Sequence, residues 1–286
     1  MKGKFLILGC NGMAGHMIST YLFEKGYDVT GVALTESNIV KTIICDVMDN
    51  KMLAKIIQEG KYDTIVNCIG ILNNAAEENK ANAIYINSFL PHFIVDLIKD
   101  TNSYFIQMST DCVFSGKKGN YIENDFKDGL TFYDRTKALG EIVDNKNVTF
   151  RASIVGPDIK ENGIGLMNWF MKQKDSVNGY SKVLWTGQTT LEYAKMIEIA
   201  AKERPVGLFN MVPDESISKY DLLMLFNKYL KKDKIIVNKY DGVTLDKSLK
   251  RTNFNFSYKV PSYEEMVIEL SEWMQLHKSM YPHYSM

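Results

Sequence analysis

The chain has 286 residues, 45% hydrophobic and 24% charged, which is enough apolar material for a sizeable buried core. Its 34 Lys and Arg residues balance 34 Asp and Glu residues, so the formal net charge is zero and no basic stripe for nucleic acid is expected. We therefore expect a globular protein of one large domain, or of one domain and a smaller lobe, that binds no nucleic acid.

The N-terminal segment and the cysteines bear on where the protein works. The opening residues MKGKFLILGCNG hold an apolar run that breaks at Gly9, too short for a secretory core or a bilayer span. The cysteines are far apart and lack C-x-x-C spacing, which favours buried thiols over a metal site or disulfides. These features predict a cytoplasmic protein without metal or membrane contact. The cysteines are Cys10, Cys45, Cys68 and Cys112.

Short β-branched or aromatic runs alternate along the first half with segments that carry apolar residues at helical spacing. Such alternation needs crossover connections, so it predicts an α/β fold with a doubly wound parallel sheet covered on both faces. The expected strands are 4–9, 27–34, 42–45, 64–70, 103–109 and 147–153, and the expected helices are 13–25, 50–59, a long one within 78–100, and 133–145.

After about residue 155 the alternation loosens, and glycines and polar residues accumulate before helical patterns return. We expect one domain over residues 1–155 and a smaller, mostly helical C-terminal lobe over 156–286, with contacts interleaved with those of the first domain. The helices expected in this lobe are 191–203, 218–231 and 262–277.

Three glycines, Gly9, Gly12 and Gly15, follow the first expected strand and open the first helix in GCNGMAG. A phosphate group can approach the backbone closely only where no Cβ intervenes, and the free N–H groups of a helix start favour an anion. A tight turn without a ligand would also use glycines. The position between the first strand and a helix nevertheless favours dinucleotide binding.

The pattern Y-x-x-x-K occurs twice, as Tyr133 with Lys137 and as Tyr21 with Lys25. Tyr133 begins a helix after the fifth strand, near the carboxyl ends of the central strands where ligands bind, whereas Tyr21 lies inside the first helix. Residues four apart share a helix face, so Lys137 is expected beside the phenol, where its charge would lower the phenol pKa from near 10. This arrangement predicts that Tyr133 transfers a proton.

The fifth expected strand ends in Ser109, Thr110 and Asp111, which the sheet would present at its carboxyl edge. A strand that runs into an ordinary polar turn would look similar. The hydroxyl, the phenol and the lysine occur in this order on a glycine-loop sheet, and that combination favours a catalytic site.

The motifs GCNGMAG, STDCVFSG, YDRTK and FRASIVGP resemble the extended short-chain dehydrogenase/reductase superfamily, and in particular the dTDP-4-dehydrorhamnose reductase family of sugar-nucleotide reductases. The resemblance covers essentially the whole chain and is weaker in its second half. It implies a Rossmann domain with a C-terminal substrate lobe. It also implies a nicotinamide cofactor, NADP(H) being favoured and NAD(H) the other option, and a nucleotide-sugar substrate.

In that family, hydride passes to C4 of a nucleotide-linked 4-keto-6-deoxy sugar, in the synthesis of surface polysaccharide precursors. The resemblance implies that Thr110 orients the carbonyl, Tyr133 protonates the alkoxide and Lys137 holds the nicotinamide ribose. For Asp46 a helix cap is the alternative role, and for Asn87 a place on the outer face of a helix. The implied cofactor contacts are Gly9, Asn11, Gly12, Met13, Gly15, Asp46, Val47, Cys68, Ile69, Gly70, Asn87, Tyr133 and Lys137.

Two positions depart from the family pattern at places where the reductases set an aromatic ring against the sugar. Cys112 replaces the tyrosine of STDYVF, and Ile154 replaces the tryptophan of RTSW, so a different sugar is expected. Trp185 and Gln188 are candidates to replace these contacts, although core packing suits Trp185 equally well. The implied substrate residues are Asp111, Cys112, Val113, Ile154, Trp185 and Gln188.

Ala33 stands where an acidic residue at the end of the second strand would bind the ribose 2′-hydroxyl, which favours NADPH over NADH. A homodimer through the apolar helix within 78–100 is a further option. A second interpretation comes from relatives that bind the cofactor but act as regulatory subunits, as the methionine adenosyltransferase β-subunit does. The fold alone would not separate these two functions.

Overall fold

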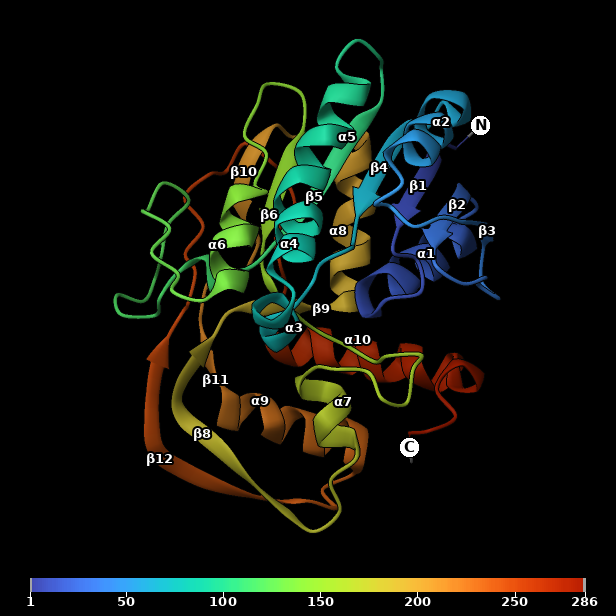
Figure 1. The fold of residues 1–286 in the computed structure, drawn as a ribbon. Helices are drawn as coiled ribbons and strands as arrows, with labels where there is room; N and C mark the ends of the chain where they lie inside the picture. The colour runs from blue at the N-terminus through green and yellow to red at the C-terminus, as the bar shows by residue number, and fades with distance from the viewer. Residues whose placement is uncertain (1, 285–286) are drawn as a thin grey trace.

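The computed structural model describes residues 2–284, and its main body is a seven-stranded parallel sheet (Figure 1). The strand order is β10-β6-β5-β4-β1-β2-β3, so β1 pairs with both β2 and β4. From β1 the chain adds β2 and β3 on one side and then β4, β5 and β6 on the other. The boundary between β1 and β4 is therefore a switch point, the place where open α/β sheets bind ligands. The strands are β1 (Lys4–Leu8), β2 (Asp28–Ala33), β3 (Lys41–Ile44), β4 (Thr64–Asn67), β5 (Tyr104–Ser109), β6 (Val148–Arg151) and β10 (Gly207–Asn210).

Helices cover both faces of the sheet, as the apolar strands predict (Figure 1). Along β1, Phe5 and Ile7 belong to one core and Leu6 and Leu8 to the other, and all four are buried. The first core is closed by α1 and α8, and the second by α2 and α5. Burial on both faces explains why these strands are almost continuously apolar. The helices are α1 (Met13–Glu24), α2 (Asn50–Gly60), α5 (Leu90–Ile98) and α8 (Thr190–Glu203).

The long helix expected within 78–100 is confirmed, and it contains a π-helical stretch in its middle. By length and composition alone, its 19 residues Lys80–Ile98 could cross a membrane, a test that core helices also pass. Leu90, Ile94 and Ile98 are buried against the sheet, so one face of this helix helps to build the core, whereas Ile84 and Phe89 are exposed. The long helix consists of α4 (Lys80–Ala83), η1 (Ile84–Phe89) and α5. A separate short helix, α3 (Asn73–Glu78), precedes it.

The second half of the chain completes the main sheet as well as forming a lobe. Strand β10 pairs in parallel with β6 at the sheet edge, and α8 lies beside α1. Phe150 of β6 packs with Phe209 of β10 and with Phe256, at ring distances of 6.0 and 5.6 Å. The residues on either side of position 155 therefore share one hydrophobic core.

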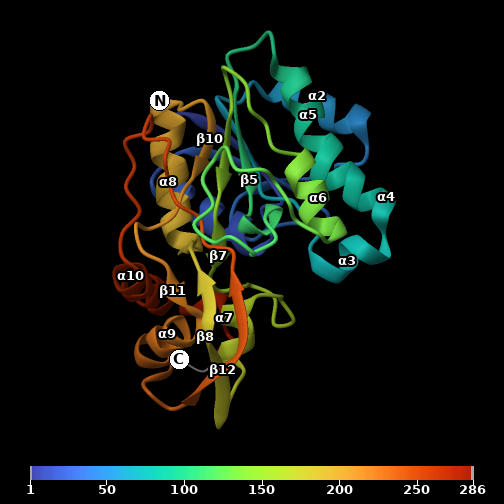
Figure 2. The same ribbon diagram turned by 90° about the vertical axis from the view of Figure 1, so that its left-hand side faces the viewer.

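The lobe lies beyond the carboxyl edge of the sheet and holds strands as well as helices (Figure 2). A three-stranded sheet, β11-β8-β12, adds to the expected helices, and its edge strand β12 shifts register between Tyr240 and Thr244. β12 is exposed along most of its length, so it lacks the apolar alternation that reveals a strand. The elements are β7 (Ser153–Val155), α7 (Leu166–Met171), β8 (Ser176–Trp185), β9 (Gly187–Thr189), β11 (Ile217–Ser218), α9 (Lys219–Phe226), η3 (Asn227–Lys231), β12 (Ile236–Asp246), α10 (Tyr263–Leu276) and η4 (Lys278–Met280).

Candidate active site

The glycine loop follows β1 and leads directly into α1. Gly9 has φ +80°, a left-handed conformation, and its N–H donates to the Val32 carbonyl at 2.8 Å. A Cβ at Gly15 would overlap the Gly9 carbonyl oxygen, whereas a Cβ at Gly12 would lie 3.3 Å from that oxygen, its nearest neighbour. The fold itself therefore requires glycine at positions 9 and 15, and Gly12 keeps the open side of the loop clear.

The start of α1 fits an anionic group. Gly12 is the N-cap and has no side chain to accept the first helical N–H groups, and the first turn, which begins at Met13, contains no acidic residue. The Asn11 amide donates to the carbonyls of Thr35 and Glu36 at 2.9 and 3.1 Å, which holds the loop after β2 beside the glycine loop. Free N–H groups and the helix dipole favour negative charge at this position. The loop thus suits the pyrophosphate of a dinucleotide.

Thr110 and Tyr133 meet at the carboxyl edge, between β5 and α6 (Phe132–Leu139). Thr110 caps the short turn η2 (Asp111–Val113), because its hydroxyl accepts the Cys112 N–H at 3.1 Å. Tyr133 lies in the first turn of α6, whose start is fixed by a capping box. Burial raises the pKa of Tyr133, Cys112 and Asp111 raise it further, and the Thr110 side chain opposes them. The phenol therefore faces the turn after β5, as the sequence predicts.

Lys137 lies one turn further along α6, where its Nζ donates to the Met108 carbonyl at 2.7 Å. Burial lowers the pKa of Lys137 to about 8, against the opposite influence of Glu141 and Cys68. Burial dominates the pKa of the Tyr133 phenol, so the expectation that Lys137 lowers this pKa stays a prediction. A raised pKa keeps Tyr133 protonated at neutral pH, but it also makes the phenol a weaker acid, so proton donation depends on stabilisation of the phenolate that forms.

The other expected cofactor contacts lie at the ends of β3 and β4. Asp46 is exposed and its carboxylate accepts the Met48 N–H at 3.0 Å, while Val47 is buried. The cap of α2 is Asp49, so the helix-cap role considered for Asp46 is wrong. The turn after β4 is half-buried and lies beside Gly9; it consists of Cys68, Ile69 and Gly70.

Asn87 is buried in η1 instead of lying on an outer helix face. Its Oδ1 accepts the Ile71 N–H at 2.9 Å, and its Nδ2 donates to Thr136 Oγ1 at 3.1 Å. A Cβ at Gly140 would overlap the Asn87 carbonyl oxygen. This close approach explains why α6 ends at Leu139, short of the expected residue 145. Asn87 thus ties the turn after β4 to the helix that carries Tyr133.

The substrate residues implied by the resemblance divide into two groups. Asp111 is buried beside Thr110, and its Oδ1 accepts hydrogen bonds from Thr110 Oγ1 at 3.0 Å and Ser153 Oγ at 2.7 Å. Cys112 is half-buried next to it, and Val113 is fully buried. Ile154, in β7, is half-buried. In this first group, Asp111, Cys112 and Val113 form the turn that the Tyr133 phenol faces, and Ile154 lies in the strand that follows β6.

Trp185 and Gln188 form the second group, and the structure places both in the core. The Trp185 ring packs 5.7 Å from the ring of Tyr263. Gln188 is fully buried, and its amide donates to the Met211 carbonyl at 2.7 Å. The expectation that they contact the substrate is therefore wrong for this structure, because packing and a buried hydrogen bond already engage them.

A buried charged network behind β5 was absent from the sequence-based prediction. Ser109 Oγ donates to Glu141 Oε1 at 2.7 Å, and Arg151 donates to both Glu141 oxygens, at 2.6 and 2.7 Å. The position of Glu141 four residues after Lys137 is the signal that could have pointed to it.

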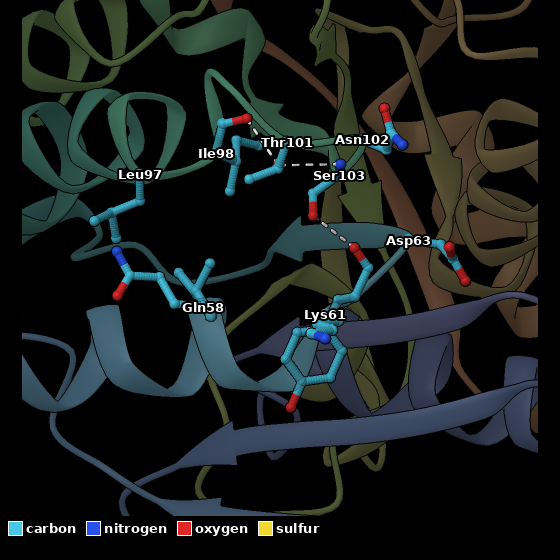
Figure 3. A pocket seen from close by; sticks show the side chains of 10 residues that line it. Gln58, Lys61, Asp63, Leu97, Ile98, Thr101, Asn102 and Ser103 are labelled. Atoms are coloured by element: carbon cyan, nitrogen blue, oxygen red, sulfur yellow. Dashed lines mark hydrogen bonds between the residues drawn. The ribbon is translucent and has the colours of Figure 1, made fainter.

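The cavity shown in Figure 3 lies elsewhere, between α2 and α5. It measures about 230 Å³ and is bordered by Asp63 and Ser103, which precede β4 and β5. Because ligands of such sheets bind at the carboxyl ends of the strands, this cavity at the amino ends is separate from the candidate active site. Among residues 2–284, no cluster of three His, Cys, Asp or Glu side chains is arranged to hold a metal.

The sheet order, the glycine loop and the tyrosine–lysine pair after β5 define a protein of the extended short-chain dehydrogenase/reductase class. Within that class the sequence matches the family described as "RmlD substrate binding domain" over residues 3–278, and the chain belongs to that family.

Two kinds of relative are found by sequence. A dTDP-4-dehydrorhamnose reductase of Streptomyces griseus is 28% identical over 142 residues, which cover 49% of this chain and 44% of that protein. The methionine adenosyltransferase 2 subunit beta of Danio rerio is 26% identical over 140 residues, which cover 48% of this chain and 42% of that protein. The matches thus span less than half of the length of these relatives.

Solved structures share the fold over nearly the whole chain. The dTDP-4-dehydrorhamnose reductase of Bacillus anthracis in complex with NADP has a TM-score of 0.79 at 18% identity, covering 94% of this chain and 99% of that one. A UDP-N-acetylglucosamine 4-epimerase of Methanobrevibacter ruminantium, in complex with UDP-N-acetylmuramic acid, has a TM-score of 0.76 at 17% identity, covering 97% and 100%.

Proposed function

We propose that this chain is an NAD(P)H-dependent reductase of a nucleotide-activated 4-keto-6-deoxy sugar, serving the synthesis of surface polysaccharide precursors. The observation that carries the proposal is the meeting of Thr110, Tyr133 and Lys137 at the carboxyl edge beside the glycine loop. Family membership and the sequence match to a dTDP-4-dehydrorhamnose reductase support it.

In the proposed mechanism, the glycine loop and the start of α1 bind the pyrophosphate of the dinucleotide. A reduced nicotinamide cofactor held there would supply the hydride that the keto carbon accepts. The Thr110 hydroxyl turns from Asp111 to donate its one proton in a hydrogen bond that orients the carbonyl oxygen. Tyr133 gives its phenolic proton to that oxygen as negative charge develops. Lys137 holds the ribose hydroxyls, and as a cation it stabilises the phenolate that remains.

The sugar is proposed to differ from that of the rhamnose reductases. Cys112 packs against the small apolar cluster that contains Tyr133, and it is far smaller than the tyrosine of the family pattern. Ile154 likewise removes an aromatic surface. A panel of dTDP- and UDP-linked 4-keto sugars, followed by the loss of NADPH absorbance, tests both the reaction and its substrate. Absence of turnover with every member would contradict the reductase function.

A regulatory role remains the second candidate, because of the match to the Danio rerio methionine adenosyltransferase 2 subunit beta. Such a subunit would bind the cofactor without turnover. The substrate panel separates the two functions, since cofactor binding without oxidation of NADPH would favour the regulatory role.

A further inference from the structure

Ser109, Glu141 and Arg151 form a buried network directly behind the proposed catalytic residues. The side chains of Glu141 and Arg151 are 0% and 2% exposed, and two parallel N–H···O bonds join them. Lys127 adds a further contact, with its Nζ 3.1 Å from Glu141 Oε2. The mechanism proposed above assigns no role to this network.

Glu141 lies where three parts of the site meet. It follows α6 immediately after Gly140, the residue at which the Asn87 backbone crosses. Its hydrogen-bond partner Ser109 ends β5 and precedes Thr110, and Arg151 ends β6. The carboxylate therefore joins the end of the helix that carries Tyr133 and Lys137 to the end of the strand that leads to Thr110.

Stability alone is a weak reason to bury such an ion pair, because removing two charges from water offsets most of their mutual attraction. The carboxylate has a second effect, on Lys137. The charged or titratable groups that act on this lysine are Glu141, beyond the end of its own helix, and Cys68, in the turn after β4. Glu141 favours the protonated ammonium, against the burial that disfavours it, whereas Cys68 is a neutral thiol whose own pKa is raised by burial. The two charged side chains reach adjacent residues of β5, because Lys137 Nζ donates to the Met108 carbonyl and Glu141 accepts the hydroxyl of Ser109.

We propose that Glu141 is a positioning residue of this site, which fixes Thr110 through Ser109 and places a buried negative charge beyond the end of the helix that carries Lys137. The catalytic consequence rests on the proposed function. The effect on Lys137 belongs to the folded chain itself and is measurable without substrate or cofactor.

The first test is an NMR titration of protein labelled at the lysine Cε carbons, with the Lys137 signal assigned by its loss in Lys137→Met. In the unsubstituted protein the midpoint should lie near pH 8. Glu141→Gln removes the negative charge and keeps the shape, so the midpoint should fall by about one unit. A midpoint that stays in place would overturn the proposal.

Two further variants complete this test: one limits the loss of stability, and the other is a control. Glu141→Gln leaves Arg151 buried without a counter-charge, so a second form combines it with Arg151→Met. Because this form removes one negative and one positive charge together, its Lys137 midpoint should lie closer to that of the unsubstituted protein than to that of Glu141→Gln. Glu198→Gln is the matched control, because Glu198 is a part-buried carboxylate that accepts the hydroxyls of Tyr21 and Tyr27 at 2.9 Å. This control should leave the Lys137 titration unchanged.

Ser109→Ala tests the link to Thr110 and keeps the ion pair. It should lower kcat several-fold at an unchanged KM for the cofactor, and it should leave the Lys137 midpoint in place. A wild-type kcat would overturn this half of the proposal. If unsubstituted protein lacks turnover while Glu141→Gln still shifts the titration, the proposed function fails and the effect of Glu141 on Lys137 stands.

Discussion

Tyr133 is the residue on which the proposed proton transfer depends, and the structure keeps its phenol buried and protonated. Tyr133→Phe retains the ring and its packing but removes the transferable proton. We expect kcat to fall by about 10²–10⁴, the usual range for a general acid, with the cofactor Kd within a few fold of wild type. Steady-state kinetics and a cofactor titration measure the two quantities. A variant that keeps more than about a tenth of the wild-type kcat would contradict the assignment.

Tyr21→Phe is the matched control for this substitution, since Tyr21 also precedes a lysine by four residues. Its hydroxyl donates at 2.9 Å to Glu198 of α8, so it makes its hydrogen bond where α1 packs against α8 and not with a residue of the candidate site. Losing that hydrogen bond should cost about 1 kcal/mol of stability and leave kcat unchanged.

Ala33 is the residue from which we predict cofactor preference. It ends β2, pairs with Ile44 of β3, and carries no acid to bind a ribose 2′-hydroxyl. We expect tighter binding of NADPH than of NADH, and we expect Ala33→Asp to reverse the order because its carboxylate would repel the 2′-phosphate. Calorimetric Kd values for both cofactors give the answer. A tenfold advantage of NADH in the unsubstituted protein, about 1.4 kcal/mol, would show that Glu36 reaches the ribose instead.

At the scale of the element, the turn from β1 into α1 contains glycines with two different roles. Gly9 and Gly15 are needed for folding, whereas Gly12 leaves space for a ligand. Gly15→Ala places a Cβ against the Gly9 carbonyl, so we expect a clear drop in Tm. Gly12→Val makes a tight but smaller contact, 3.3 Å from its Cβ to the Gly9 carbonyl oxygen, and it fills the open side of the loop. Dinucleotide binding should therefore be lost, with a smaller drop in Tm than Gly15→Ala causes. Thermal unfolding and calorimetric titration of both variants test the contrast. Undiminished dinucleotide binding by Gly12→Val would show that this loop is a tight turn without a ligand.

At the scale of the whole molecule, the two halves share a core, so the first 155 residues should not fold alone. Without the rest, Met17 and Ile18 of α1 lose α8, and Phe150 loses Phe209 and Phe256. Exposing three or four such side chains costs about 1.5–3 kcal/mol each, comparable with a total stability of about 5–15 kcal/mol. We expect one cooperative urea transition for the full chain and none for fragment 1–155, measured by circular dichroism. A cooperative transition in the fragment would establish an independent domain.

The sequence predicted the inner strands of the main sheet well because they are buried on both faces, which leaves a strong local pattern. The edge strand β3 is partly exposed, and the other edge strand, β10, was not among the expected strands. The glycine loop and the Tyr133 helix were predictable for a similar reason, since their positions follow from the order of strands and helices. Glu141 was missed because its partners Ser109 and Arg151 become neighbours only when β5 and β6 pair. Gln188 was misplaced because its burial depends on Met211, more than twenty residues away.

The register shift in β12 has a consequence for the behaviour of the protein in concentrated solution. An exposed edge strand of this length would ordinarily offer its free N–H and C=O groups to a strand of another copy, the first step toward aggregation. Between Tyr240 and Thr244 the strand takes two residues more than its partner, so an incoming strand can align with either half but not with both. Lys239 and Asp241 place charges next to the interruption. The register shift is therefore expected to protect the open edge of β12 from fibrous self-association.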